Sequence, residues 1–450
     1  MNKVYFRAIE GKSTQYFIAL VVFGALAALG MLITYIMYDQ GLGHENAYLG
    51  RLTGMNSRVP WGLGIVMAIY YIGLSAGSLV ISALSSVFGQ KEYKPFGRMG
   101  VYLSILLIIA ALMSIILDWG RPDRIINPFI YLNPSSMFSI NTLLYSVYMF
   151  IGFLYLLAMF AENEKWVGRI SLLAVFWAVL VHSGTGFIFG GTLRELYESP
   201  LLIPGFVVAA LSSGTALIIL VIQITFKASN RKLDTELIKG LSRLLVIFII
   251  VVLYFITVEN LFRGYVAKSR EAEWYFLFGE NFHQVLNGDW KAFFTPRAAG
   301  NIHHFMFWIG LILVGTILPA LILYIKKLKD SIIWINLASL MVVVGVLCER
   351  YIIVIPGQTH KIELIKGAKV IFKDSIDKLA GTITSATSVS MGVAQYNISL
   401  AEILQAVGIG SLVVFAFLLG VKWFDLLPTE AKALSTESPA NPSSPEQEKD

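Results

Sequence analysis

The sequence contains a single cysteine, Cys348, among its 450 residues. One thiol forms no disulfide within the chain and cannot hold an iron–sulfur cluster, which usually takes four cysteines. The C-x-x-C patterns of haem attachment and of zinc sites are missing, as are the Walker A lysine loop and the dinucleotide-binding glycine motif. We therefore expect no haem, no iron–sulfur cluster and no metal in this chain, and we assign any sulfur-bound redox cofactor to a partner.

Charged residues are also scarce. They make up 14% of the chain, whereas soluble domains carry about 25%. Hydrophobic residues make up 56%, and the mean hydropathy is +0.70. The alternating segments of a β-barrel are missing. This composition predicts an all-α polytopic membrane protein whose helices satisfy their own backbone groups in lipid. The net charge of +6 follows from membrane topology, and we do not expect nucleic-acid binding.

Ten stretches are long and apolar enough to cross about 30 Å of hydrocarbon as helices. The first follows Lys3, Arg7 and Lys12 and is too long for a signal-peptide core, so we expect it to remain as an anchor. The predicted spans cover residues 16–38, 60–88, 96–117, 137–162, 166–190, 200–226, 241–265, 302–327, 332–355 and 401–424.

A weak internal repeat has a step of four helices. Span 2 begins at Pro60 and contains "GLSAG", and span 6 begins at Pro200 and contains "LSSGTA". Spans 3 and 7 both end in an acid followed by an arginine. Because an even step preserves orientation, the two halves would be parallel repeats. We expect two four-helix bundles, spans 2–5 and 6–9, with peripheral first and last helices. The corresponding parts are residues 1–59, 60–199, 200–356, 357–427 and 428–450.

The distribution of lysine and arginine predicts the orientation. The N-terminus and the connections at 89–98, 163–169, 227–243 and 326–331 are basic, and the opposite connections carry few basic residues. We expect a cell-membrane protein with both termini in the cytoplasm. Loops 266–301 and 356–400 are then external and suited to dock a partner. The polar tail 428–450 is expected to be disordered.

Ionisable residues within the spans gather at one level, near the outer ends. Such groups usually face a bundle interior or a cavity, so we expect a polar site there. Simpler explanations remain open for each residue, including interfacial ion pairs, mutual neutralisation of Glu349 and Arg350, and a histidine bonded to a carbonyl. The candidate residues are Asp118, Arg121, Arg124, His182, Arg194, Glu259, Glu349 and Arg350, with His303 and His304 at the start of span 8.

His182 lies in the stretch "LVHSGTGFIFG", where small residues leave space beside the imidazole. Trp61, Tyr70 and Tyr71 lie on span 2, which begins at the same outer face of the membrane. A cleft that is aromatic, partly polar and accessible from lipid suits a quinone ring with its isoprenoid tail.

Four motifs, in order between Pro60 and Gln358, together resemble the NrfD-type membrane subunits of respiratory iron–sulfur complexes. They are "PWGLGIVMAIYYIGLSAGS", "LDWGRPDRIINPF" with "NPSSMFS", "HSGTGFIFG" and "ERYIIVIPGQ". The number of spans is similar to that of the HybB and DsrP branch, and we favour DsrP. The resemblance implies a subunit of a membrane-bound oxidoreductase, within membrane lipid, that exchanges electrons between menaquinone or ubiquinone and an external ferredoxin-like iron–sulfur subunit.

On this hypothesis His182 binds the quinone headgroup and accepts its first proton, because imidazole titrates near neutrality. Asp118 or Glu259 would orient the imidazole or pass the proton on. The other residues expected to bind the quinone are Trp61, Tyr70, Tyr71, Arg121, Arg124 and Arg194, and the candidates for a proton path are Glu259, Glu349 and Arg350.

Two other functions remain open. A secondary transporter or proton-translocating protein is also built from repeats around a polar site, although that site usually lies at the midplane. A b-haem subunit could use His182 with His303 or His304 as axial ligands. Substrate uptake would support the first, and a haem absorption band would support the second.

Overall fold

The computed structural model describes residues 6–9, 13–42, 53–56, 59–119, 122–192, 194–279, 284, 286–290, 302–359 and 396–431. Among the sequence predictions, those for Arg121, for most of loop 356–400 and for the tail after residue 431 concern residues outside these ranges.

Within the described ranges the fold is almost entirely helical, and ten helices are long and apolar enough to cross a membrane. The predicted fold class and the ten spans are thus confirmed. Span 7 begins earlier than predicted, because the Asp234 side chain accepts a hydrogen bond from the backbone of Glu236 and caps the helix. Seven spans are α1 (Thr14–Leu42), α7 (Met137–Phe160), α8 (Glu164–Gly190), α9 (Leu202–Ala228), α10 (Thr235–Tyr265), α17 (Ile332–Val354) and α20 (Leu400–Trp423).

The remaining spans are built from consecutive pieces. Span 2 joins α3 (Leu63–Ser75), α4 (Gly77–Ser82) and the π-helix η1 (Ala83–Val87), and span 3 joins η2 (Lys91–Phe96) and α5 (Gly97–Asp118). Span 8 joins α14 (Ile302–Phe305), the π-helix η5 (Met306–Ile317) and α15 (Leu318–Tyr324). The short elements are η3 (Pro122–Arg124), α6 (Asn127–Ile130), α11 (Arg270–Phe278), α16 (Lys326–Lys329), α18 (Pro356–Thr359), β1 (Lys232–Leu233) and β2 (Glu430–Ala431).

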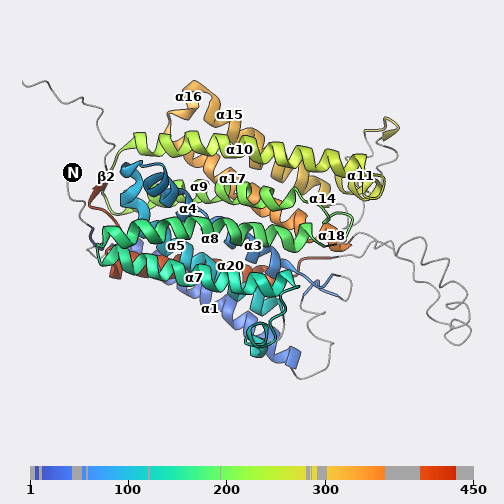
Figure 1. Cartoon of the computed structure of the whole chain (residues 1–450), viewed down its shortest axis with the longest axis horizontal. Helices are drawn as coiled ribbons and strands as arrows, with labels where there is room; N and C mark the ends of the chain where they lie inside the picture. Colours follow the sequence, from blue (N-terminus) through green and yellow to red (C-terminus); the bar gives the residue numbers. More distant parts are fainter. Residues whose placement is uncertain are drawn as a thin grey trace, which may run out of the picture.

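The helices pack as two similar groups with α1 and α20 paired beside them (Figure 1). In the first group α3 packs on α5, α5 on α7, and α7 on α8. In the second, α9 packs on α10, α10 on η5 and α15, and η5 on α17. Across the groups, α3 packs on α17 and α8 packs on α9. Each contact therefore has a counterpart in the other group, as expected for parallel repeats.

Gly77 and Gly214, which occupy equivalent places in spans 2 and 6, meet where these helices cross. A Cβ at Gly77 would lie 2.6 Å from the carbonyl oxygen of Gly214, and a Cβ at Gly214 would lie 2.3 Å from the backbone nitrogen of Gly77. Only glycine permits this approach, because the obstructing atoms belong to the backbone. Contact between equivalent positions is what a two-fold axis between the halves produces.

Replacing Gly214 by alanine should therefore destabilise the protein by about 1–3 kcal/mol, the usual cost of overpacking a close-packed core. Gly168→Ala on α8 is the matched control, because a Cβ at Gly168 meets no atom within 4 Å. Thermal unfolding in detergent measures both variants. Equal melting temperatures for Gly214→Ala and Gly168→Ala would contradict the crossing described above.

The segments before α1 and after α20 meet at one end of the bundle. Phe6 forms a β-bridge with Pro428, and Lys232 and Leu233 of β1 pair in parallel with Glu430 and Ala431 of β2. Helices α11, α14 and α18 lie at the opposite end (Figure 1). We call the latter the α11 end.

Candidate functional site

A cleft lies at the α11 end of the second helix group. It contains about 680 Å³ of space between atoms, a volume that includes its open mouth. Its walls come from α9, α10, η5 and α17, with contributions from α11, α18 and the turn after α8. The apolar lining residues include Leu202, Phe206, Val252, Phe255, Phe276, Phe307 and Leu311.

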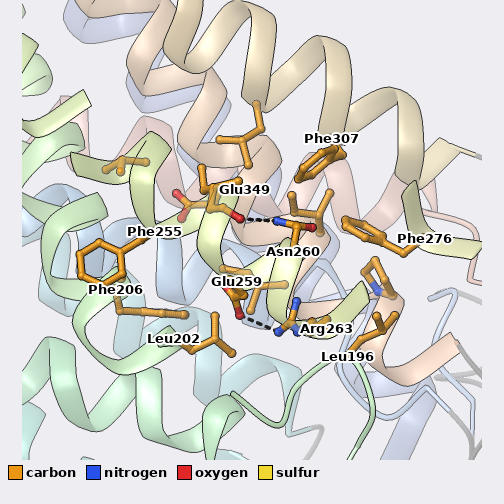
Figure 2. A pocket seen from close by; sticks show the side chains of 17 residues that line it. Leu196, Leu202, Phe206, Phe255, Glu259, Asn260, Arg263, Phe276, Phe307 and Glu349 are labelled. Carbon is orange, nitrogen blue, oxygen red and sulfur yellow. Dashed lines mark hydrogen bonds and ion pairs between the residues drawn. The ribbon is translucent and has the colours of Figure 1, made fainter. Parts of the chain in front are cut away.

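Four polar side chains interrupt this apolar lining: Glu259, Asn260, Arg263 and Glu349 (Figure 2). The first three are on α10, within about one helical turn, and Glu349 comes from α17. An apolar cleft with a few convergent polar groups is the usual form of a site for a small amphipathic molecule.

Glu259 forms an ion pair with Arg263, whose Nη2 lies 2.7 Å from its Oε1. The side chains are only 13% and 10% exposed. The spacing of four residues places both on one face of α10. Ser199, in the turn before α9, also forms a hydrogen bond with the Glu259 side chain. An acidic group and its counter-charge are therefore held in the cleft wall before any ligand binds.

Asn260 offers an unused acceptor beside this pair. Its Nδ2 donates to the backbone oxygen of Ile256 over 2.6 Å. Its Oδ1 has no hydrogen-bond partner among the described residues. A hydroxyl group entering the cleft could donate to this oxygen.

Arg350 is fully buried behind the same wall. Its Cζ lies 4.3 Å from the ring centroid of Phe206, and its Nη2 lies 3.9 Å from Glu349 Oε2. None of its side-chain nitrogens has a hydrogen-bond partner within the described ranges. The cation–π contact and the nearby carboxylate offset part of the cost of burying this charge.

The η5 segment is unusual because its 12 residues form a π-helix. Phe307 and Leu311 of η5 line the cleft, and η5 packs against α17, where Gly315 and Gly345 come into close contact. Single π-helical turns often occur at functional sites, and longer segments are rare.

His182 lies elsewhere, buried between α8 and α3. Its Nδ1 is 2.6 Å from the carbonyl oxygen of Ala178, and its Nε2 is 3.1 Å from that of Ile72. Ile72 lies just before the break between α3 and α4. In a regular α-helix the Ala76 amide would bond to the carbonyl oxygen of Ile72, but here it bonds to that of Gly73. Both nitrogens can donate only when the imidazole is protonated, because a neutral ring carries one N–H. The predicted bond to a ligand would require Nε2 to leave Ile72.

Arg350 connects this histidine region to the cleft. A Cβ at Gly73 would lie 3.6 Å from Arg350 Nη2, so the guanidinium lies close to span 2 at this position. Gly73 directly follows Ile72, whose carbonyl oxygen faces His182. The same guanidinium lies over Phe206 of the cleft wall.

Asp118 holds the N-terminus of α3. Its carboxylate accepts hydrogen bonds from the backbone of Gly62 and Ile65. Glu402 of α20 reinforces this region by accepting from Tyr396 over 2.7 Å and from the backbone of Ser399 over 2.9 Å. Carboxylates suit a helix N-terminus because its N–H groups lack partners within the helix. Asp118 therefore serves as a cap, whereas Glu259, its counterpart in the repeat, faces the cleft.

The predicted aromatic residues fall into two groups. Trp61 stacks on Tyr197 at 6.3 Å, and its backbone exchanges two hydrogen bonds with the Gln358 side chain, at 2.9 and 3.1 Å. The hydroxyls of Tyr70 and Tyr71 bond to backbone oxygens of α17 and α20. None of the three lines the cleft described above.

The predicted arginines are likewise dispersed. Arg194 donates to the carbonyl oxygen of Gly357 over 3.2 Å and so joins the turn after α8 to α18. Arg124 is exposed in η3. The structure thus brings together Glu259 and Glu349, with Arg350 behind them, and it leaves His182, Asp118 and the predicted aromatics outside the cleft.

Sequence reasoning does not assign Asn260, Phe206 or Phe307 to a site. Asn260 adjoins Glu259, and a polar pair in a long apolar helix is the signal that could have found it. Phe206 and Phe307 give no signal, because an aromatic residue in a membrane helix is most often in contact with lipid or the core. Among the described residues, no group of three or more histidine, cysteine or acidic residues could hold a metal ion. The expected lack of haem, clusters and metal stays a prediction.

Comparisons with known proteins add an independent observation. Residues 51–362 match the family model "Polysulphide reductase, NrfD". The chain is 37% identical over 429 residues to the Hdr-like menaquinol oxidoreductase integral membrane subunit of Archaeoglobus fulgidus, covering 95% of this chain and 98% of that protein. It is 29% identical over 376 residues to a selenate reductase subunit of Mesobacillus selenatarsenatis, covering 75% and 81%. It is 22% identical over 353 residues to the menaquinone reductase integral membrane subunit of Nitratidesulfovibrio vulgaris, covering 72% and 77%.

Proposed function

The chain belongs to the NrfD polysulphide reductase family, and from this we propose that it is the quinone-binding integral membrane subunit of a redox complex. Its substrate is menaquinol or menaquinone, in keeping with the names of its relatives in Archaeoglobus fulgidus and Nitratidesulfovibrio vulgaris. The electrons pass between this quinone and a partner subunit that carries one-electron centres of the iron–sulfur class.

One observation carries the proposal: the cleft at the α11 end is apolar along most of its wall and polar at one cluster. A quinone has the same division, with two oxygens on a flat ring and a long apolar tail. Phe206, Phe255 and Phe307 supply surfaces for the ring and the tail (Figure 2). Glu259, Asn260 and Glu349 supply groups that can bond to the quinone oxygens.

Oxidation of the quinol releases two electrons and two protons, so the site needs proton acceptors as well as a route for electrons. The carboxylate of Glu259 can accept one proton, and Asn260 Oδ1 can receive a hydrogen bond from a quinol hydroxyl. Arg263 balances the charge of Glu259 when that carboxylate is ionised. The same groups act in reverse when quinone is reduced.

We further propose that the α11 end faces outward and that both termini lie in the cytoplasm, as the distribution of basic residues predicts. Helix α11 and residues 286–290, which include the exposed Trp290, then lie on the external side. A partner subunit docked there would bring its redox centres near the cleft, whereas a partner on the opposite side would be separated from it by most of the bundle.

The function is tested on the complex purified in mild detergent. A cluster-bearing subunit should copurify, and a short-chain naphthoquinol should reduce its clusters, as followed by their visible absorbance. A preparation of the Glu259→Gln variant should contain the same clusters, but the naphthoquinol should reduce them much more slowly. If no redox subunit copurifies and labelled solutes are instead taken up by vesicles containing the chain, the transporter alternative replaces this proposal.

A further inference from the structure

Glu273 is a buried acid that the proposed site does not use. It lies on α11, outside the ten spans, and its relative exposure is 0%. Neither carboxylate oxygen has a hydrogen-bond partner among the described residues. On the same helix, Arg270 and Glu271 are exposed, whereas Ala272 and Phe276 are buried. Glu273 therefore belongs to the face of α11 that packs onto the bundle, where an unpartnered carboxylate is costly.

The helices packed against α11 are α10, α14 and η5, and η5 contributes the rings of Phe307 and Trp308, which do not titrate. From α10, Arg263 attracts its charge and Glu259 repels it. From α14, the titratable residues are His303 and His304, both buried. The nearest charges are thus one guanidinium and one carboxylate, and that guanidinium is already paired with Glu259.

Two buried carboxylates share a single cation in this arrangement. One ionised carboxylate neutralises Arg263, but a second would leave an uncompensated negative charge in a medium of low dielectric constant. Burial raises the pKa of Glu273 to about 8, with Arg263 opposing the shift and Glu259 adding to it. Glu273 is therefore mostly protonated at neutral pH and releases its proton as the pH rises through about 8.

Glu259, Arg263 and Glu273 together extend from the cleft toward the end of the molecule. Glu259 and Arg263 line the cleft, and so does Phe276, one turn after Glu273 on α11. Glu273 itself does not line it. Helix α11 lies at the end of the bundle (Figure 1), and its residues Arg270 and Glu271 are exposed there.

We propose that Glu273 is the second proton carrier of this site, which takes the proton that Glu259 accepts from quinol and delivers it to the surface at the α11 end. This rests on the proposed function. In the step, an O–H bond on Glu259 breaks and one on Glu273 forms, so that the negative charge moves between two carboxylates beside Arg263. Glu259 is returned to its ionised form and can accept the second proton. No electron moves in this step.

The variants Glu273→Gln and Glu273→Asp test the proposal in the purified complex, with Glu271→Gln as the matched control on the exposed face of the same helix. Glu273→Gln should slow naphthoquinol-dependent turnover about tenfold, less than the loss expected for a group that contacts the substrate. Glu271→Gln should stay close to wild type, and Glu273→Asp, which keeps a carboxylate, should recover part of the loss.

The pH profile separates this role from a structural one. Only ionised Glu273 can accept a proton, so wild-type turnover should rise as the pH increases through about 8, the pKa of this carboxyl. Glu273→Gln should lack this rise, and Glu273→Asp should retain it. If Glu273→Gln keeps the wild-type rate and profile, the relay is wrong. If it fails to assemble, a Glu273→Asp profile without the rise would overturn the relay.

Binding of a short-chain naphthoquinone, measured by titration of the same preparations, keeps the two proposals apart. The wild type and Glu273→Gln should bind it with equal affinity. Absence of binding to the wild type would overturn the proposed function, whereas equal binding with unchanged turnover and pH profile in Glu273→Gln would overturn only the relay.

Discussion

Replacing Glu259 by glutamine should lower quinol-dependent turnover by about 10²–10⁴-fold, the usual contribution of a positioned acid–base group. Glutamine retains the size and hydrogen-bonding capacity of the side chain but cannot accept the proton. Its amide also cannot neutralise Arg263, which lies 2.7 Å away. Stopped-flow reduction of the partner's redox centres by a naphthoquinol measures the effect.

The matched control is Glu236→Gln, the same substitution near the other end of α10. Glu236 pairs with Lys239 over 2.8 Å and lies far from the cleft along the helix, so this variant should turn over at the wild-type rate. Assembly is checked by the amount of copurifying partner. Turnover by Glu259→Gln at a rate close to that of Glu236→Gln would mean that Glu259 accepts no proton.

His182→Gln should assemble normally and keep quinol-dependent turnover close to that of the wild type, because Glu259 is the proposed proton acceptor and both ring nitrogens of His182 face carbonyl oxygens outside the cleft. The glutamine amide can still donate a hydrogen bond to the carbonyl of Ile72, which faces Nε2 at 3.1 Å. His182→Ala should keep its turnover but lose some stability. It leaves the Ile72 carbonyl without this donor, which costs about 1–3 kcal/mol when a buried group is left unsatisfied.

Thr185→Val is the control for the loss of a buried polar group from α8, because Thr185 bonds to Tyr145 over 2.8 Å and does not face the cleft. Its turnover should match the wild type. A loss of turnover of about a hundredfold in both His182 variants, with normal assembly, would instead make His182 the proton acceptor that the sequence predicts and would contradict the assignment to the cleft.

Hydropathy is sufficient to predict the ten helices, because lipid requires every spanning segment to satisfy its own backbone groups. The small residues of spans 2 and 6 also indicate how the halves pair, because glycines such as Gly77 and Gly214 mark helix crossings. The break between α3 and α4 and the π-helix η5 are not predictable in this way. Both depend on bonds and contacts made with other helices, which an isolated helical pattern does not contain.

The candidate site is predictable only in part. Spans 3 and 7 carry the same pattern, an acid followed by an arginine, yet Asp118 caps α3 and Glu259 faces a cleft. The difference comes from the rotation of each helix and from its neighbours, so the sequence alone does not distinguish the two uses. The sequence predicts only that Glu273 lies in an external loop suited to dock a partner. It does not predict the burial of Glu273, because that depends on how α11 folds back onto α10.

The central claim is that the quinone headgroup occupies the cleft between α9, α10, η5 and α17. A photoreactive naphthoquinone, activated in the purified complex and mapped by mass spectrometry of the peptides, tests it most directly. The account predicts labels on the segments that carry Phe206, Phe255 and Phe307, and loss of the label when excess unlabelled naphthoquinone is present. Labelling confined to the segments around Trp61 and His182 would contradict it and would place the headgroup in the first helix group.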